Sequence, residues 1–171
     1  MEEERKTLEV FYTYNNWLKF SKEFKRKYKE ENGKPLDCNV AQEITFNKLV
    51  KNVNKLQTVT NEDGTKEQKI VASQEVRLPE IEDVVTLIKL GIPDCTDDMA
   101  LEKVKIFFAK EENKNVGLIG LHLVLVCLFY KDLDIISGAY KKAKEIKDKY
   151  FEQIKSTFNK KVDTDKVDTQ E

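Results

Sequence analysis

The strongest constraint on the fold is an apolar run at positions 116–130, which reads VGLIGLHLVLVCLFY. A membrane-crossing helix needs about 20 apolar residues, so this shorter run predicts a buried helix and no membrane contact. Because the run is apolar almost all round, other helices have to surround it. The chain is therefore expected to fold as a helical bundle with this segment at its centre.

The composition supports amphipathic helices around that centre. Charged residues make up 36% of the 171 residues and hydrophobic residues 40%, whereas an average domain has about 25% charged residues. This length is sufficient for one domain with its own core. The net charge is −1, so any attraction to phosphate has to come from a local patch.

Apolar residues recur every three or four positions in five further segments, which predicts five more helices. Asp37 is expected to cap the second of them and Thr96 the fourth, while Gly33 and Gly91 are expected to end the first and third. The five predicted segments are 8–31, 39–56, Pro79 up to Gly91, Thr96 up to the polar turn at 111–115, and 133–160.

The pair Asp63-Gly64 lies between two short β-prone runs and predicts a hairpin. Thr58–Thr60 and Lys69–Ala72 are the expected strand cores. An isolated hairpin is only marginally stable, so it should either dock on helices or move freely. A flexible acidic loop is the alternative.

The predicted fold class is mainly α, a bundle of about six helices with one β-hairpin and a disordered C-terminal tail. Residues 1–161 are expected to form a single domain, and residues 162–171 are expected to form the acidic tail. An alternative division places lobes at 8–56 and 79–161, joined by a hairpin at 57–76.

The cysteines Cys38, Cys95 and Cys127 are widely spaced and form no CxxC motif. Neither a zinc site nor a disulfide framework is expected from this pattern. The N-terminal sequence lacks the basic-then-apolar layout of a signal peptide. The predicted location is intracellular, in the cytoplasm, or in the host nucleus if the protein is viral.

No combination of residues predicts catalysis. The single histidine, His122, is five positions from Cys127, which places the two about 140° apart around a helix. A calcium loop centred on Gly64 would need carboxylates at Val59 and Ile70, and neither residue has one. The prediction is therefore a non-enzyme with no catalytic residue, no metal ligand and no cofactor. An enzyme with an unrecognised site stays as an alternative.

The segment 14–35, YNNWLKFSKEFKRKYKEENGKP, combines five aromatic rings with an excess of basic side chains. Rings at helical spacing predict a stripe that faces the core, formed by Tyr14, Trp17, Phe24 and Tyr28. The basic residues form a stripe on the other side. The predicted contact residues are Lys19, Lys22, Lys25, Arg26, Lys27 and Lys29, with Phe20 and Tyr12 as aromatic contacts outside the core stripe.

These features favour a helical protein that binds a macromolecule, with another protein or a second copy as the leading partner. The alternative is sequence-nonspecific nucleic-acid binding through the basic helix at 19–34. The chain has 27 lysines and three arginines, so it is poorly equipped to read base edges. This lysine-rich composition indicates an AT-rich coding genome and suggests an accessory protein of a virus, phage or mobile element.

Overall fold

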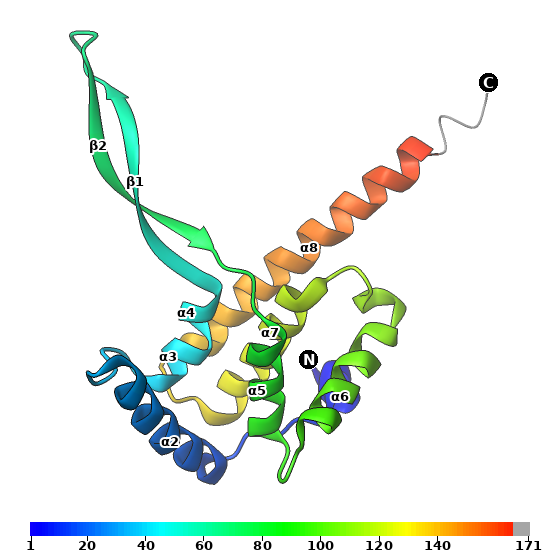
Figure 1. Cartoon of the computed structure of the whole chain (residues 1–171). Helices are drawn as coiled ribbons and strands as arrows, with labels where there is room; N and C mark the ends of the chain where they lie inside the picture. Colours follow the sequence, from blue (N-terminus) through cyan, green and yellow to red (C-terminus); the bar gives the residue numbers. More distant parts are fainter. Residues whose placement is uncertain (166–171) are drawn as a thin grey trace.

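The structure is a computed structural model that describes residues 1–165, with side chains described for 1–49, 53–72 and 77–157. It is mainly α with one two-stranded antiparallel sheet, which confirms the predicted fold class. The helices form a body, and two elements project from it (Figure 1). These are the ribbon of β1 (Val50–Thr60) and β2 (Lys66–Val76) and the long helix α8 (Ala139–Asp165).

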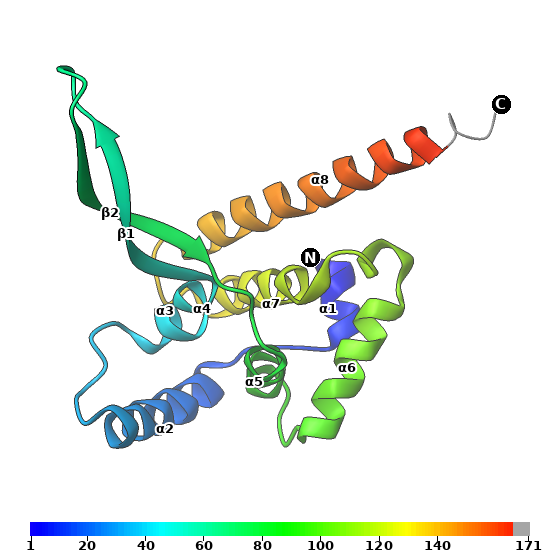
Figure 2. The same cartoon turned by 45° about the horizontal axis from the view of Figure 1, so that its top comes forward.

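Helix α7 (Gly117–Leu133) lies at the centre of the body, as the apolar run predicts (Figure 2). Every residue in 120–130 is buried. Helix α5 (Ile81–Gly91) and the first part of α8 pack against it. Covering α7 from several sides removes its apolar surface from water, and this burial is the main source of stability in such a fold.

The single helix predicted for 8–31 is wrong at its start. Two helices are present instead, α1 (Glu2–Leu8) and α2 (Tyr14–Asn32). Glu9 adopts a left-handed conformation (φ 54°) that ends α1, and the next residues are extended. The predicted stop at Gly33 is confirmed, because this glycine caps α2 with φ 69°.

The extended segment between α1 and α2 packs against the end of α5. The Phe11 amide donates a hydrogen bond to the Gly91 carbonyl at 2.9 Å. Val10 and Tyr12, two positions apart, both enter the core, which is the spacing of an extended chain rather than a helix. A Cβ atom at Gly91 would lie 2.2 Å from Val10 Cγ1, so only glycine permits this approach.

The helix predicted for 39–56 is also wrong beyond its first half. Helices α3 (Val40–Ile44) and α4 (Phe46–Leu49) are short, and the chain then enters β1. The cap of α3 is Asn39, whose side chain accepts a hydrogen bond from the Gln42 amide at 3.0 Å, and not Asp37. The β-branched and asparagine residues that follow are weak helix formers, and pairing with β2 decides their conformation.

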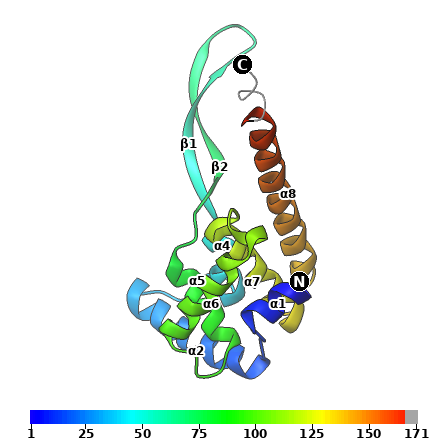
Figure 3. The same cartoon turned by 90° about the vertical axis from the view of Figure 1, so that its right-hand side faces the viewer.

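The predicted hairpin is confirmed, with strands of 11 residues each that extend well beyond the expected cores. The turn lies at Asp63-Gly64, where Gly64 has φ 82° and Asp63 accepts a hydrogen bond from the Thr65 amide at 2.9 Å. In the antiparallel register Leu56 lies opposite Ile70. The ribbon continues far from the body in every view (Figures 1 and 3).

Helix α6 (Asp97–Ala109) begins at the predicted cap, Thr96, and a short 3₁₀ turn, Glu111–Asn113, follows it. Val104 and Phe107 of this helix are buried, whereas Leu101 is exposed. Helix α8 starts later than predicted and continues to Asp165, so residues 162–165 are helical. The rest of the predicted disordered tail, 166–171, lies outside the described residues.

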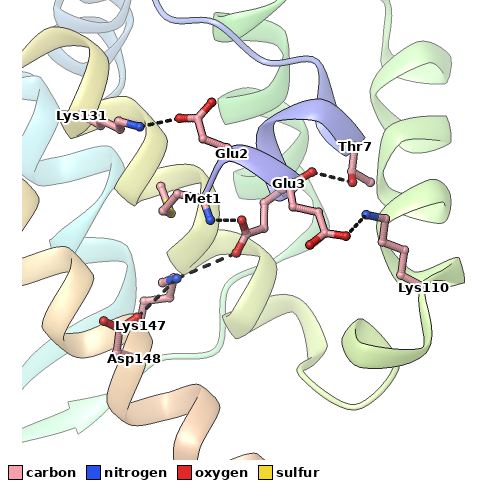
Figure 4. A network of polar contacts seen from close by, with 9 residues as sticks. Met1, Glu2, Glu3, Thr7, Lys110, Lys131, Lys147 and Asp148 are labelled. Atoms are coloured by element: carbon pink, nitrogen blue, oxygen red, sulfur yellow. Dashed lines mark hydrogen bonds and ion pairs between the residues drawn. The ribbon is translucent and has the colours of Figure 1, made fainter.

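Helix α1 is attached to the body through ion pairs (Figure 4). Arg5, which is 8% exposed, donates two hydrogen bonds to the Asp132 carboxylate at 2.9 and 2.6 Å. Asp132 also accepts a hydrogen bond from the Tyr12 amide at 3.1 Å. Because one carboxylate serves both α1 and the extended segment, it fixes the path of the chain between α1 and α2.

His122 is fully buried, and neither of its ring nitrogens has a hydrogen bond of ordinary geometry among the described residues. Burial lowers its pKa to about 4, although the Asp83 carboxylate and the Ile44 backbone favour the protonated form. Lys48, which pairs with Asp83 at 3.2 Å, opposes protonation as well. His122 therefore stays neutral inside the core at pH 7.

The stability of the fold should fall as the pH is lowered from about 6.5 towards 4. The unfolded chain binds a proton at His122 near pH 6.5, whereas the folded chain resists it down to about 4. The free energy of unfolding should lose about 3 kcal/mol over this interval, measured by urea denaturation at successive pH values. The His122→Leu variant should be much less sensitive to pH there, and equal sensitivity in both proteins would contradict this assignment.

Replacing Asp132 by alanine should destabilise the protein by about 3 kcal/mol, because Arg5 would keep a largely buried charge without its partner. Urea denaturation measures the change. The matched control is Glu30→Ala, which removes the partner of the exposed Arg26 and should cost less than about 0.5 kcal/mol. Similar losses of unfolding free energy in both variants would contradict a stabilising role for the Arg5–Asp132 pair.

Candidate interaction surfaces

The predicted basic contact residues all lie exposed on α2, but their surroundings differ. Arg26 pairs with Glu30 at 2.7 Å, and Lys27 pairs with Glu23 at 3.1 Å. The other four make no ion pair among the described residues. These four are Lys19, Lys22, Lys25 and Lys29.

Tyr12 is a core residue, and its prediction as a surface contact is wrong. It is 5% exposed, its hydroxyl donates a hydrogen bond to the Leu87 carbonyl at 3.1 Å, and the centroids of its ring and the Phe129 ring lie 5.3 Å apart in an edge-to-face contact. Burial raises the pKa of its hydroxyl. Tyr12 is buried rather than exposed because the segment around it is extended and not helical.

The rings of α2 are less buried than the periodicity predicts. No residue of α2 is buried. Tyr14 is 62% exposed, although its hydroxyl donates a hydrogen bond to the Leu133 carbonyl. Trp17, Phe24 and Tyr28 are half-buried, and Trp17 packs on Phe129 at 5.0 Å. The prediction of an inward-facing stripe is therefore wrong for Tyr14 and only partly met by the other three.

Phe20 joins these rings in a ladder along α2. Successive ring centroids lie 6.1 Å apart from Trp17 to Phe20, 5.7 Å from Phe20 to Phe24, and 6.4 Å from Phe24 to Tyr28. The angles between successive ring planes are 28°, 35° and 24°. The rings of Phe20 and Phe24 are therefore each flanked by other rings on both sides.

A groove of about 850 Å³ separates this ladder from the end of α5 and the turn that leads into α6. Phe20 and Phe24 line one wall, and Leu90 with the turn residue Pro93 lines the other. Lys19, Lys27 and Lys89 also line the groove. The α5 side of this groove could not be predicted from the sequence, because residues about 70 positions apart in the chain meet there and no local pattern links them.

The ribbon forms a second candidate surface. Leu56 and Ile70, a cross-strand pair, are each 70% exposed. The described side chains beside them on the same face are uncharged over most of the ribbon: Asn54, Thr58, Gln68 and Ala72. This surface was not predicted from the sequence, because the predicted strand cores were too short to include Leu56. The β-compatible residues that continue back to position 50 are the signal that could have indicated longer strands.

The structure gives His122 and Cys127 different neighbours. The charges nearest His122 are Asp83 and Lys48, whereas those nearest Cys127 include Lys147 and Asp148. Burial raises the pKa of the Cys127 thiol to about 12, so it is protonated at neutral pH. These two residues therefore cannot act as a base and nucleophile pair without a large rearrangement of the core.

In the described part of the chain, no group of three or more His, Cys, Asp or Glu side chains is arranged to hold a metal ion. None of its helices combines the length with the apolar character that crossing a bilayer requires. All three cysteines are free, with Cys95 and Cys127 buried and Cys38 partly accessible.

The chain matches no protein-family model, and no curated protein or solved structure is significantly similar to it. The assignment of function therefore depends on the two surfaces themselves.

Proposed function

We propose that the protein is a non-enzymatic helical binding protein that makes protein–protein contacts through the ribbon β1–β2. The observation that carries this proposal is the exposed pair Leu56 and Ile70, at 70% each, on a ribbon that contacts the body at α4, near the base of the ribbon. Figure 3 shows the ribbon and α8 extending from the same side of the helical body. On this proposal the protein acts by binding a partner and not by catalysing a reaction.

The energetics of the ribbon favour a partner. A two-stranded hairpin alone is marginally stable in water, and three strands or a packed face are needed for independent stability. Burying a leucine or isoleucine side chain contributes about 1.5–3 kcal/mol. A partner that covers Leu56 and Ile70 therefore stabilises the ribbon while it binds.

The charges of the ribbon favour a protein over nucleic acid. Residues 50–76 contain four lysines and four acidic residues, so their net charge is zero. Phosphate binding draws its affinity from an excess of cations, which this element lacks. Uncharged amide and hydroxyl side chains around an apolar pair are instead common at protein interfaces.

A second copy of the chain is the partner that this face suits best. In a two-fold contact each residue meets the same surface on the other subunit, so a charged face would repel itself. The face around Leu56 and Ile70 avoids this, because its amides and hydroxyls can both donate and accept hydrogen bonds. An intracellular location and an accessory role for a virus, phage or mobile element stay predictions from the sequence.

The test is self-association of the purified protein. Sedimentation velocity across a wide concentration range should show a monomer–dimer equilibrium. The Leu56→Asp and Ile70→Asp variants should shift the dissociation constant by at least about tenfold, because each places a charge in the centre of the contact.

The matched control is Lys69→Asp, which changes the charge on the opposite face of the same ribbon. This variant should dimerise like the original protein. A chain that stays monomeric at every concentration, or a dimer that is equally sensitive to all three substitutions, would contradict the proposal.

A further inference from the structure

The wall of the groove formed by α2 has the pattern that one helix presents to another. Its lining positions on α2 recur at spacings of three and four: Asn16, Lys19, Phe20, Glu23, Phe24 and Lys27. Residues at this spacing lie on one face of a helix and are the ones that pack against a neighbouring helix. In this structure α5 covers that face only in part, and Phe20 and Phe24 on it are half-buried against the core.

The opposite wall is apolar near its base. Leu90 and Cys95 are 6% and 8% exposed and lie beside Ile92 and Pro93 along the groove. Burial raises the pKa of the Cys95 thiol, so it is protonated at neutral pH and behaves as a small apolar group. The groove therefore has an apolar base between two helical walls, with a volume in the upper part of the range of about 300–1,000 Å³ typical of ligand pockets.

The backbone hydrogen-bonding groups of a bound peptide limit which conformation it can have in the groove. The groove is lined by α2, α5 and the turn before α6, so it offers no strand edge. An extended peptide would lose water from its backbone amides and carbonyls without gaining strand partners. A helix satisfies these groups internally and presents only side chains, which makes it the suitable occupant.

The ring geometry argues against nucleic acid in this groove. A base that stacks on protein needs the free face of an aromatic ring. Phe20 and Phe24 each lie between two other rings along α2, with centroids 5.7 to 6.4 Å apart and interplanar angles of 35° or less, which leaves no space for a base between successive rings. The half-buried surfaces of these two rings suit aliphatic side chains.

Charge determines the polar residues of the occupant. Lys19 lines the groove and makes no ion pair among the described residues, whereas Lys27 is paired with Glu23 at 3.1 Å. Across the groove Lys89 pairs with Asp97 at 2.6 Å. Of the three lysines that line the groove, Lys19 is therefore the one without an ion-pair partner among the described residues. A partner helix with an acidic residue beside its apolar stripe complements Lys19.

We propose that the groove between α2 and the α5–α6 turn binds an acidic amphipathic helix of another protein. Two apolar side chains of that helix pack against Phe20 and Phe24, and an acidic side chain pairs with Lys19. This site shares no residue with the ribbon, so it stands or falls independently of self-association.

A selection from displayed random peptides of about 16 residues, which is about 24 Å of helix, tests the chemistry of the occupant. The bait is the full chain, and a parallel selection uses the Phe24→Glu variant. Peptides enriched only on the original protein should carry apolar residues at spacings of three and four with an excess of Asp and Glu. Enrichment of basic or extended sequences, or no enrichment that depends on Phe24, would overturn the proposal.

The affinity of one selected peptide can be followed through the fluorescence of Trp17, the only tryptophan in the chain. Lys19→Glu should weaken binding by at least about tenfold, and exchanging the facing acidic residue of the peptide for lysine should restore it. Lys25→Glu is the matched control, because Lys25 lies on α2 outside the groove, and it should change the affinity by less than about twofold. Far-UV circular dichroism checks that each variant keeps its helices.

Oligo(dT) titrated under the same conditions provides the remaining comparison. No change in Trp17 fluorescence that depends on Phe24 is expected with this probe. Tight binding of oligo(dT) that is lost in Phe24→Glu, with no competition from the peptide, would replace the helix by single-stranded nucleic acid and overturn the proposal. Because every variant leaves Leu56 and Ile70 unchanged, failure here would say nothing against the ribbon contact.

Discussion

Helix α7 has no polar face to present to water, and the positions of its neighbours follow from the need to cover it. Residues 120–130 are buried without exception, so α5, α8, α3 and the extended segment after α1 all have to contribute apolar surface. The hydroxyl of Tyr130 on α7 lies 2.8 Å from the Thr45 hydroxyl, so this buried polar atom has a hydrogen-bond partner inside the core. Elements from both halves of the chain therefore share one core around a single helix.

The charged end of α7 holds the N-terminal part of the chain in place. Asp132 stands where α7 leaves the core, and it accepts hydrogen bonds from the Arg5 guanidinium and the Tyr12 amide. Around it α1 adds ion pairs on its outer side, from Glu2 to Lys131 and from Glu3 to Lys110 (Figure 4). The outer pairs are exposed and contribute little, whereas the bidentate pair is largely shielded from water. This contact directs α2 along the edge of the body, where none of its residues is buried.

The need to cover α7 does not explain two parts of the fold. The ribbon and the groove-facing side of α2 do not cover α7, and both expose large apolar side chains, Leu56 and Ile70 on the ribbon and half-buried rings on α2. Surfaces of this kind usually mark contacts with other molecules. Their charges separate the two proposals, since the side chains around the apolar pair of the ribbon are uncharged, whereas the groove presents the unpaired lysine Lys19.

The sequence by itself determined the features that depend on neighbouring residues. The buried helix at 116–130, the stop at Gly33, the cap at Thr96 and the turn at Asp63-Gly64 all follow from periodicity or local backbone preference. Tertiary structure alone decided the break after α1, the change from helix to strand at Val50 and the burial of Tyr12. It also formed the groove, whose walls are distant in the chain. These outcomes depend on long-range contacts, such as Val10 against Gly91 and Leu56 opposite Ile70, whose free energy exceeds the small helix preferences of the residues involved.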